Sequence, residues 1–296
     1  MNFNSEPIRS VAVLCAAYNG IRYLDQQLLS IIRQEGMRVA IYLSVDISSD
    51  GTFELCKAWA LKNADIVVLE YGETFGGAAK NFFRLIRDVD FSQYDYVALA
   101  DQDDIWFSNK LHRAITSIEN RQVDAYSSNV IAFWPDGTEK LIIKSQPQTE
   151  YDFLFQGAGP GCTYVFKSRA LVSFKSYLLK NEQTINNIAF HDWALYAFFR
   201  SRNKSWFIDP TPGMRYRQHA TNQLGANSGL KEFSKRFFMV KKKWYKKEVE
   251  KIVALAGDSP INFSLNRFFL IKNFWKLRRR MKNKLFLLFF LLVGLF

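Results

Sequence analysis

Three carboxylates fall within four residues of the chain, at Asp101, Asp103 and Asp104. Carboxylates this close repel one another unless a cation neutralises them. Mg²⁺ or Mn²⁺ suits such a group, because these hard ions bind one or two carboxylates and complete their shell with substrate phosphate oxygens. An ion bound in this way can stabilise the charge that develops when a diphosphate leaves. The run therefore points to a metal site for a phosphorylated substrate.

The same acids also fit a structural role. An aspartate at the start of a helix caps free backbone N–H groups, and Asp103 or Asp104 would cap a helix predicted from Ile105 to Ile115. A cap accounts for one of the three acids and leaves the other two unexplained. The residues alone keep both roles open.

Strand and helix patterns alternate through the first hundred residues, and the fourth strand ends at these acids. Continuous apolar runs predict buried strands at Val11–Ala17, Val39–Val45, Ile66–Leu69 and Tyr96–Ala100. Helical spacing predicts helices within Leu24–Ile32, Thr52–Leu61 and Ala78–Arg87. This order is typical of an α/β protein with a mostly parallel sheet and helices on both faces.

In such a sheet, ligands bind at the carboxyl ends of the strands. The polar residues Tyr18 and Asn19, Asp46, and Asp101 all fall at those predicted ends. Because parallel strands end at the same edge, we expect these residues to share one binding site.

The second half is less regular. It contains a strand at Tyr126–Phe133, a turn at 134–137 leading to Leu141–Ile143, and a glycine-rich loop at 157–161 before a strand at Cys162–Phe166. An aromatic-rich helix is predicted at Ala189–Arg200, and a strand at Trp206–Ile208. The patterns place these elements in the same domain.

Several separated segments resemble glycosyltransferase family 2, whose members have the Rossmann-like GT-A fold. The run ALADQDDIW, from Ala98 to Trp106, is similar to the DxD-containing segment of that family. GAAKNFFRLI, HDWALY and YRQHATNQLGAN resemble its rhamnosyltransferase-like branch. The match covers about residues 9–226, and we therefore expect a GT-A glycosyltransferase domain over residues 1–226.

The resemblance implies how a nucleotide-sugar donor is held. Ala17, Tyr18 and Asp46 would bind the base and ribose. Asp101 and Asp103 match the two acids of the DxD element, which hold Mg²⁺ or Mn²⁺ and the diphosphate, and Asp104 is left as the helix cap. The chain departs from the family beside Asp46, where Ile47 stands in a turn that usually contains a glycine.

Further residues are predicted to complete the donor site. His219 matches a family position that completes the metal shell or contacts the diphosphate, and the nearby Arg217 suits the same anion. Lys80 and Asn81 open a helix after two glycines, where backbone N–H groups favour anions, so we expect donor contacts there.

The resemblance implies Asp192 as the general base of an inverting transfer. Such a base takes the proton from an acceptor hydroxyl as its oxygen attacks the anomeric carbon opposite the leaving diphosphate. Asp192 lies where a helix begins, so an N-cap is the structural alternative. His191 would orient the base or the acceptor, whereas His112 is predicted to lie on the surface.

Composition limits the remaining possibilities. A chain of 296 residues that is 48% apolar and 16% aromatic is neither disordered nor fibrous. Its three cysteines are far apart and form no CxxC pair, which fits a reducing cytoplasm and argues against disulfides. The first ten residues lack the pattern of a signal peptide.

The positive charge is concentrated near the C-terminus. Residues 227–284 contain 17 Lys and Arg against 4 Asp and Glu, whereas the rest of the chain contains 23 against 24. Leu285–Phe296 carries no charge and would reach about 18 Å as a helix, short of the roughly 30 Å hydrocarbon core of a bilayer. We expect residues 227–296 to form basic amphipathic helices and a hydrophobic tail that lies on the inner face of the cell membrane. A helix packed on the core is the alternative.

These features predict an inverting, metal-dependent glycosyltransferase with a saccharide or lipid-linked acceptor, active in cell-surface polysaccharide synthesis. The branch suggests dTDP-L-rhamnose as donor, with a UDP-hexose as the alternative. A nucleotidyltransferase would need a glycine-rich phosphate loop, which is missing after Ala17. A basic membrane- or nucleic-acid-binding protein without catalysis is the remaining class. No nucleic acid is expected, since the basic residues lie in a tail with a lipophilic end.

Overall fold

The computed structural model describes residues 8–219, 244–257 and 263–296, and its centre is a seven-stranded sheet. The strand order is β10-β6-β9-β4-β1-β2-β3. The first four predicted strands are confirmed as β1 (Arg9–Ala17), β2 (Met37–Val45), β3 (Ile66–Val68) and β4 (Tyr96–Ala100), all parallel. β6 (Ala125–Ser128) and β10 (Trp206–Asp209) are parallel to each other, and β9 (Val165–Lys167) runs antiparallel between β4 and β6.

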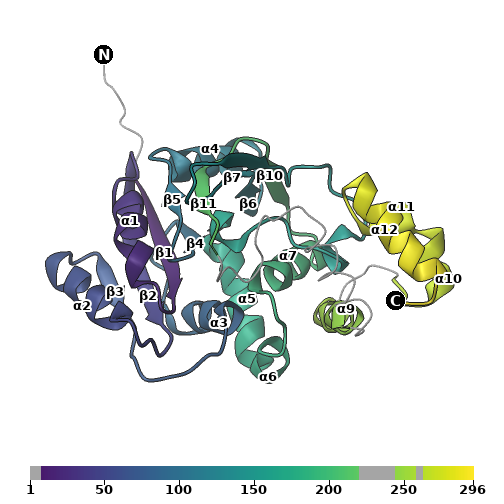
Figure 1. The fold of residues 1–296 in the computed structure, drawn as a ribbon, viewed down its shortest axis with the longest axis horizontal. Coiled ribbons are helices and arrows are strands. Elements are labelled where there is room, and N and C mark those ends of the chain that lie inside the picture. Colours follow the sequence, from purple (N-terminus) through teal and green to yellow (C-terminus); the bar gives the residue numbers. More distant parts are fainter. Residues whose placement is uncertain (1–7, 220–243, 258–262) are drawn as a thin grey trace, which may run out of the picture.

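Helices cover both faces of this sheet, as the alternating pattern predicts (Figure 1). Apolar residues of α1 (Ile21–Ile32), α2 (Thr52–Lys62) and α4 (Lys110–Asn120) form a core with Val11, Val13 and Cys15 of β1. The alternate residues Ala12 and Leu14 face the other core, with α3 (Ala78–Asp88), α5 (Ser168–Lys180) and α7 (His191–Ser201). The side chains of β1 therefore serve two cores in alternation, which explains its continuous apolar run.

A second sheet of four strands brings distant segments beside the acidic run. Its order is β5 (Ile105–Trp106), β11 (Met214–Arg217), β7 (Val130–Phe133) and β8 (Glu139–Ile142). The predicted helix over Ile105–Ile115 is wrong at its start, because Ile105 and Trp106 pair with β11 and α4 begins only at Lys110. The extended pairing is favoured because it buries Trp106.

The strand predicted at Tyr126–Phe133 is also corrected. It divides at Asn129 into β6 of the large sheet and β7 of the small sheet. The Asn129 side chain accepts hydrogen bonds from the backbone N–H groups of Lys144 and Ser145, and donates to the carbonyl of Pro210. These bonds stabilise the point where the chain passes from one sheet to the other.

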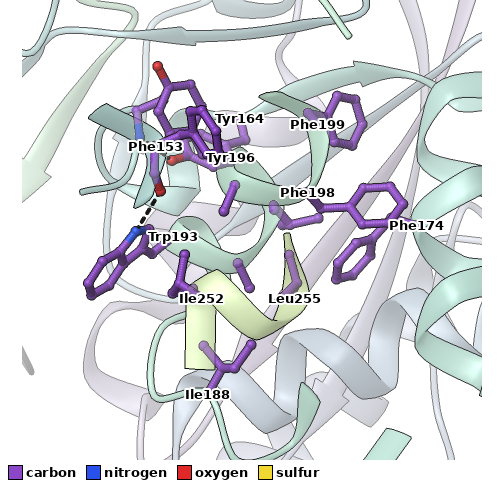
Figure 2. Packing of buried hydrophobic residues seen from close by; sticks show 14 of the residues in the cluster. Phe153, Tyr164, Phe174, Ile188, Trp193, Tyr196, Phe198, Phe199, Ile252 and Leu255 are labelled. Atoms are coloured by element: carbon purple, nitrogen blue, oxygen red, sulfur yellow. Dashed lines mark hydrogen bonds between the residues drawn. The ribbon is translucent and has the colours of Figure 1, made fainter. Parts of the chain in front are cut away.

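The C-terminal helices pack on the α/β domain. Val249, Ile252 and Leu255 of α9 (Trp244–Leu255) are buried in the core that contains α7, and Figure 2 shows Ile252 and Leu255 near Trp193 and Phe198. α10 (Arg267–Lys272), α11 (Phe274–Leu277) and α12 (Met281–Leu292) form a group at one end of the molecule (Figure 1). The expected boundary at residues 226 and 227 lies outside the described residues. In the described ranges, no helix has the length and apolar character needed to cross a bilayer.

The α/β domain also contains three short helices: η1 (Asp152–Leu154), η2 (Gly161–Thr163) and α6 (Glu182–Ile185). The three cysteines are buried and free, as expected from their spacing.

Candidate active site

The acidic run lies at the carboxyl end of β4, between the two sheets. Asp101 follows the strand directly, and Asp103 contacts His219 beyond the end of β11, with 2.6 Å between Asp103 Oδ2 and His219 Nε2. Both side chains are partly accessible, at 15% and 16% exposure. Two of the three predicted metal ligands, 116 residues apart in sequence, are thus in contact.

Asp104 has a different role from the predicted helix cap. It is fully buried, and its Oδ1 accepts a hydrogen bond of 3.0 Å from the backbone N–H of Arg217. The Arg217 guanidinium in turn donates from Nε to the carbonyl of Asp103, at 2.7 Å, and from a terminal nitrogen to Gln26. Asp104 therefore fastens the acidic run to β11, and the helix-cap assignment is wrong because α4 begins six residues later.

Gln102 ties the acidic run to the loop after β1. Its Oε1 accepts from the backbone N–H of Tyr18 at 2.7 Å, and its Nε2 donates to the carbonyl of Tyr18 at 2.8 Å. A Cβ on Gly20 would lie 2.1 Å from Gln102 Oε1, so only glycine leaves room for this contact. The sequence prediction missed Gln102, although it stands between two of the proposed ligands. Tyr18 itself is exposed and Ala17 is buried.

Asp46 organises the loop that leads into α3. Its two carboxylate oxygens accept from the backbone N–H groups of Phe75, at 3.0 Å, and Gly76, at 3.1 Å, and from that of Ile47. Ile47 does not have a positive φ. The turn therefore forms without the left-handed backbone that would favour a glycine at that position.

The two residues proposed at the start of α3 differ in accessibility. Asn81 is buried and donates from Nδ2 to the carbonyls of Ala17 and Ser44, which joins the ends of β1 and β2. Lys80 is exposed on the same helix. A direct donor contact is therefore more accessible to Lys80, while Asn81 supports the strand ends beneath it.

Asp192 is the second residue of α7, and Phe190 occupies the N-cap position that the structural alternative gives to Asp192. Burial raises the pKa of Asp192 to about 6, although the backbone N–H of Trp193 and the charge of Lys144 act in the opposite direction. A Cβ on Gly157 would lie 3.5 Å from Asp192 Oδ2, so the glycine-rich loop packs directly on this carboxylate. A carboxyl with such a pKa is suited to act as a general base near neutral pH.

The two predicted halves of the site are near enough for their charges to interact. Burial and the neighbouring Asp103 are the larger causes that raise the pKa of Asp101, and the charge of Asp192 adds to them. Asp101 and Asp192 are 91 positions apart and lie on different elements, yet their charges interact. The fold therefore places the proposed base within electrostatic reach of the acidic run.

A buried lysine that the sequence prediction missed lies beneath the acidic run. Lys110 donates to the carbonyl of Cys162 at 2.8 Å, and its ammonium lies 3.1 Å from the centre of the Trp106 ring. Burial lowers the pKa of Lys110 to about 7, whereas charge interactions with Cys162, Asp104 and Asp101 raise it. No periodicity in the sequence of α4 marks Lys110 as buried.

The donor atoms available to a metal ion favour a hard cation. Asp101, Asp103 and His219 offer oxygen and imidazole ligands, and adjacent ligands of an octahedral ion are about 3 Å apart, close to the observed contact between Asp103 and His219. Ligand atoms of Asp101, Asp104 and Cys162 also lie within 4.8 Å of one another. Asp104 and Cys162 of that second group are fully buried, and Cys162 is a soft thiol, so the group suits Mg²⁺ or Mn²⁺ less well.

The other two histidines are also placed. The His191 ring stacks on Phe82, with 4.0 Å between ring centres, and a Cβ on Gly161 would lie 2.2 Å from its Nε2. Burial lowers the pKa of His191 to about 3, so its ring is neutral at pH 7. His191 therefore lies below the glycine-rich loop, while His112 is exposed on α4 as predicted.

Comparison with known proteins defines the class. Residues 12–178 match the model of "Glycosyl transferase family 2". The chain is 45% identical over 288 residues, 95% of its length, to the dTDP-rhamnosyl transferase RfbG of Shigella flexneri, which is covered completely. The chain therefore belongs to glycosyltransferase family 2 and is a glycosyltransferase, similar to a rhamnosyltransferase.

Solved structures support the fold. A fragment of S. aureus TarS in complex with UDP-GlcNAc is similar with a TM-score of 0.61 and 13% identity, over 90% of this chain and 72% of that one. The mannosyltransferase PcManGT from Pyrobaculum calidifontis, in complex with GDP-Man and Mn²⁺, is similar with a TM-score of 0.52 and 14% identity, over 98% and 86% of the chains. At these identities the likeness concerns the GT-A fold alone.

Proposed function

We propose that this chain transfers rhamnose from dTDP-L-rhamnose, with inversion, to a saccharide acceptor carried by a lipid at the inner face of the cell membrane. The donor is inferred from the 45% identity to the dTDP-rhamnosyl transferase of Shigella flexneri, which extends over 95% of this chain. The reaction is inferred from the raised pKa of Asp192, which lies on the buried first turn of α7, and from its charge interaction with Asp101. Transfer of this kind belongs to cell-surface polysaccharide synthesis.

The donor half of the site is assigned to the strand ends. Ala17, Tyr18 and Asp46 are proposed to hold the nucleoside, and Lys80, Asn81 and Arg217 to support or contact the diphosphate. Asp101, Asp103 and His219 are proposed to bind Mg²⁺ or Mn²⁺, which supplies positive charge beside the departing diphosphate. Arg217 fits this role because its side chain already lies against the carbonyl of Asp103.

The acceptor half is assigned to Asp192. Its carboxylate takes the proton of the acceptor hydroxyl while that oxygen forms a bond to the anomeric carbon and the bond to the diphosphate breaks. Attack from the face opposite the diphosphate inverts the anomeric configuration. Lys144 stabilises the ionised carboxylate, because its charge opposes the effect of burial on the pKa of Asp192.

A membrane contact through α12 is also proposed. Leu287, Phe290 and Leu291 are buried, whereas Met281, Leu285, Phe289 and Leu292 are 54–63% exposed and recur at helical spacing. The helix is thus apolar toward the protein and apolar on its outer face. The neighbouring cations Arg280 and Lys284 suit anionic headgroups beside that face.

The donor assignment is tested with a panel of nucleotide sugars. Thermal shift and donor hydrolysis are measured for dTDP-L-rhamnose, UDP-glucose, UDP-GlcNAc and GDP-mannose, each with and without Mn²⁺. We expect the dTDP sugar to stabilise the protein most, and only with the ion. A larger thermal shift with a UDP sugar would contradict dTDP-L-rhamnose as the donor. Equal thermal shifts with and without Mn²⁺ would contradict the proposed metal dependence.

A further inference from the structure

An arginine from the C-terminal helices is buried inside the catalytic domain. Arg279, between α11 and α12, has a side chain that is 3% exposed. It donates to Asp152 Oδ2 at 2.7 Å and to the carbonyl oxygen of Gly157 at 2.8 Å. One guanidinium therefore joins η1 to the glycine-rich loop, 122 residues earlier in the chain.

The ionic partner of Arg279 does not depend on it alone. Asp152 is fully buried, and it also accepts from the Tyr196 hydroxyl at 2.9 Å and from Arg200 at 3.3 Å. Arg200 also donates to Gln148, Thr149 and Tyr196, and these partners lie outside the loop at 157–161. Two arginines thus neutralise one carboxylate, and Arg279 is the one that also holds the loop.

The bonded loop lies against the proposed base. Gly157 packs on Asp192 Oδ2. The Tyr164 hydroxyl accepts from the backbone N–H of Ala158 at 2.9 Å and lies 3.3 Å from the carbonyl of Asp192. Trp193 donates from its indole to the carbonyl of Phe153 at 2.9 Å, the contact drawn in Figure 2. Phe153, which follows Asp152, is therefore bonded to Trp193, which follows Asp192. Tyr164 likewise links Ala158, which follows Gly157, to Asp192.

Adjacent contacts hold the same two segments together. The carbonyl of Lys276 accepts from the Thr149 hydroxyl at 2.7 Å and from the backbone N–H of Tyr151 at 3.1 Å. Arg278 donates to the carbonyl of Phe155 and to the Tyr245 hydroxyl. The segment 276–279 thus borders residues 149–157 along their length, and Arg279 is its most deeply buried cation.

We propose that Arg279 is a positioning residue for the transfer: it fixes the glycine-rich loop against Asp192 and so defines the acceptor side of the site. The inference rests on the proposed role of Asp192 as base. It gives the C-terminal helices a part in catalysis that is separate from any contact with a membrane.

The test compares Arg279→Lys and Arg279→Gln with the matched control Arg200→Gln in the full chain. Transfer of labelled rhamnose from dTDP-L-rhamnose to a bacterial membrane lipid extract is measured with Mn²⁺. We expect both Arg279 variants to lose about tenfold to a hundredfold in kcat, because a misplaced reacting group is slow even when it is bound. The KM for the donor stays within about twofold, since the acidic run is untouched. Arg200→Gln keeps its kcat.

A variant that unfolds would give the same loss, so the melting temperature of each variant is measured. Asp152 keeps one arginine in Arg279→Gln and one in Arg200→Gln, so we expect the two variants to melt at similar temperatures. The kcat of Arg279→Gln is low at a temperature where the protein is folded, because the Gly157 carbonyl is released. Wild-type kcat in folded Arg279→Gln, or an equal loss of kcat in folded Arg200→Gln, would overturn the proposal.

A readout without substrate separates this inference from the proposed function. Amide hydrogen exchange is measured on the free proteins, and we expect faster exchange at residues 157–161 in Arg279→Gln than in Arg200→Gln. Unchanged exchange there would refute the positioning role. Faster exchange in a protein whose wild type transfers no rhamnose would uphold the role of Arg279 in holding the loop and reject the donor assignment.

Discussion

The proposed donor side and the proposed acceptor side of this site are built in different ways. The donor side collects residues from the ends of neighbouring parallel strands, where Asp46 and Asp101 follow β2 and β4 directly. The acceptor side is assembled from α7, the loop at 157–161 and Arg279. Side-chain hydrogen bonds to backbone carbonyls join these parts. Strand topology therefore fixes the donor side, while long-range polar contacts hold the acceptor side.

Asp103→Asn is expected to cause the largest loss, because it removes a charged ligand from the donor side. Transfer falls by roughly a hundredfold to a thousandfold, the scale of losing one charge-stabilising group at a reacting centre. The measurement is the transfer rate as a function of Mn²⁺ concentration. Asp136→Asn, in the exposed hairpin turn, is the matched control and keeps its rate. A wild-type dependence of the transfer rate on Mn²⁺ in Asp103→Asn would contradict the role of Asp103 as a metal ligand on the donor side.

The acceptor side is expected to govern the pH dependence. The pKa of Asp192 is raised to about 6 by burial, so the base becomes protonated as pH falls through that value. The charge of Asp192 interacts with Lys144, Tyr164 and Asp101. Burial lowers the pKa of Lys144 to about 8. Between these two pH values the carboxylate is ionised beside a charged lysine.

We therefore expect kcat to fall about tenfold per pH unit below 6, in a profile of kcat measured at saturating donor. Donor affinity is followed separately by calorimetry with dTDP. A kcat that stays constant down to pH 4.5 would show that the titrating base lies elsewhere.

Asp46→Ala is expected to act on stability as well as on the donor. The change leaves the backbone N–H groups of Phe75 and Gly76 without their acceptor, at a cost of about 1–3 kcal/mol. The free energy of unfolding in urea, measured without nucleotide, should fall by this amount. An unchanged free energy would mean that the loop is held by other contacts, and the role of Asp46 would then be confined to the nucleoside.

Gln102→Ala is expected to have the smallest effect. It removes two hydrogen bonds to the backbone of Tyr18, which contribute about 1 kcal/mol each, so dTDP binding should weaken by roughly fivefold to thirtyfold. Calorimetric titration with dTDP and Mn²⁺ gives the value. A matched Gln148→Ala change, beside η1 on the acceptor side, leaves dTDP binding unchanged.

Sequence reasoning located the strand ends of the sheet well for a physical reason. A strand buried on both faces leaves an apolar run, and the residue after it stands at the ligand-binding edge, so Asp46 and Asp101 can be located by counting. The central sheet with helices on both faces is confirmed, and so is the membership of glycosyltransferase family 2.

Other features depend on partners that no local pattern reveals. Asp104 looked like a helix cap, but it accepts from Arg217, 113 residues later, through a second sheet that the sequence did not indicate. Lys110 and Arg279 read as surface cations among many, yet both are buried against carbonyl oxygens. Helix and strand patterns repeat over a few residues, so they do not reveal contacts between residues that are far apart in the chain.

The most direct test of the account measures binding and transfer in the same variant. Asp192→Asn is titrated with dTDP and Mn²⁺, and then assayed with dTDP-L-rhamnose and a membrane lipid extract. The account predicts dTDP affinity within about twofold of wild type and a loss of transfer of roughly a thousandfold. Wild-type transfer by this variant would contradict the two-sided site described for this glycosyltransferase.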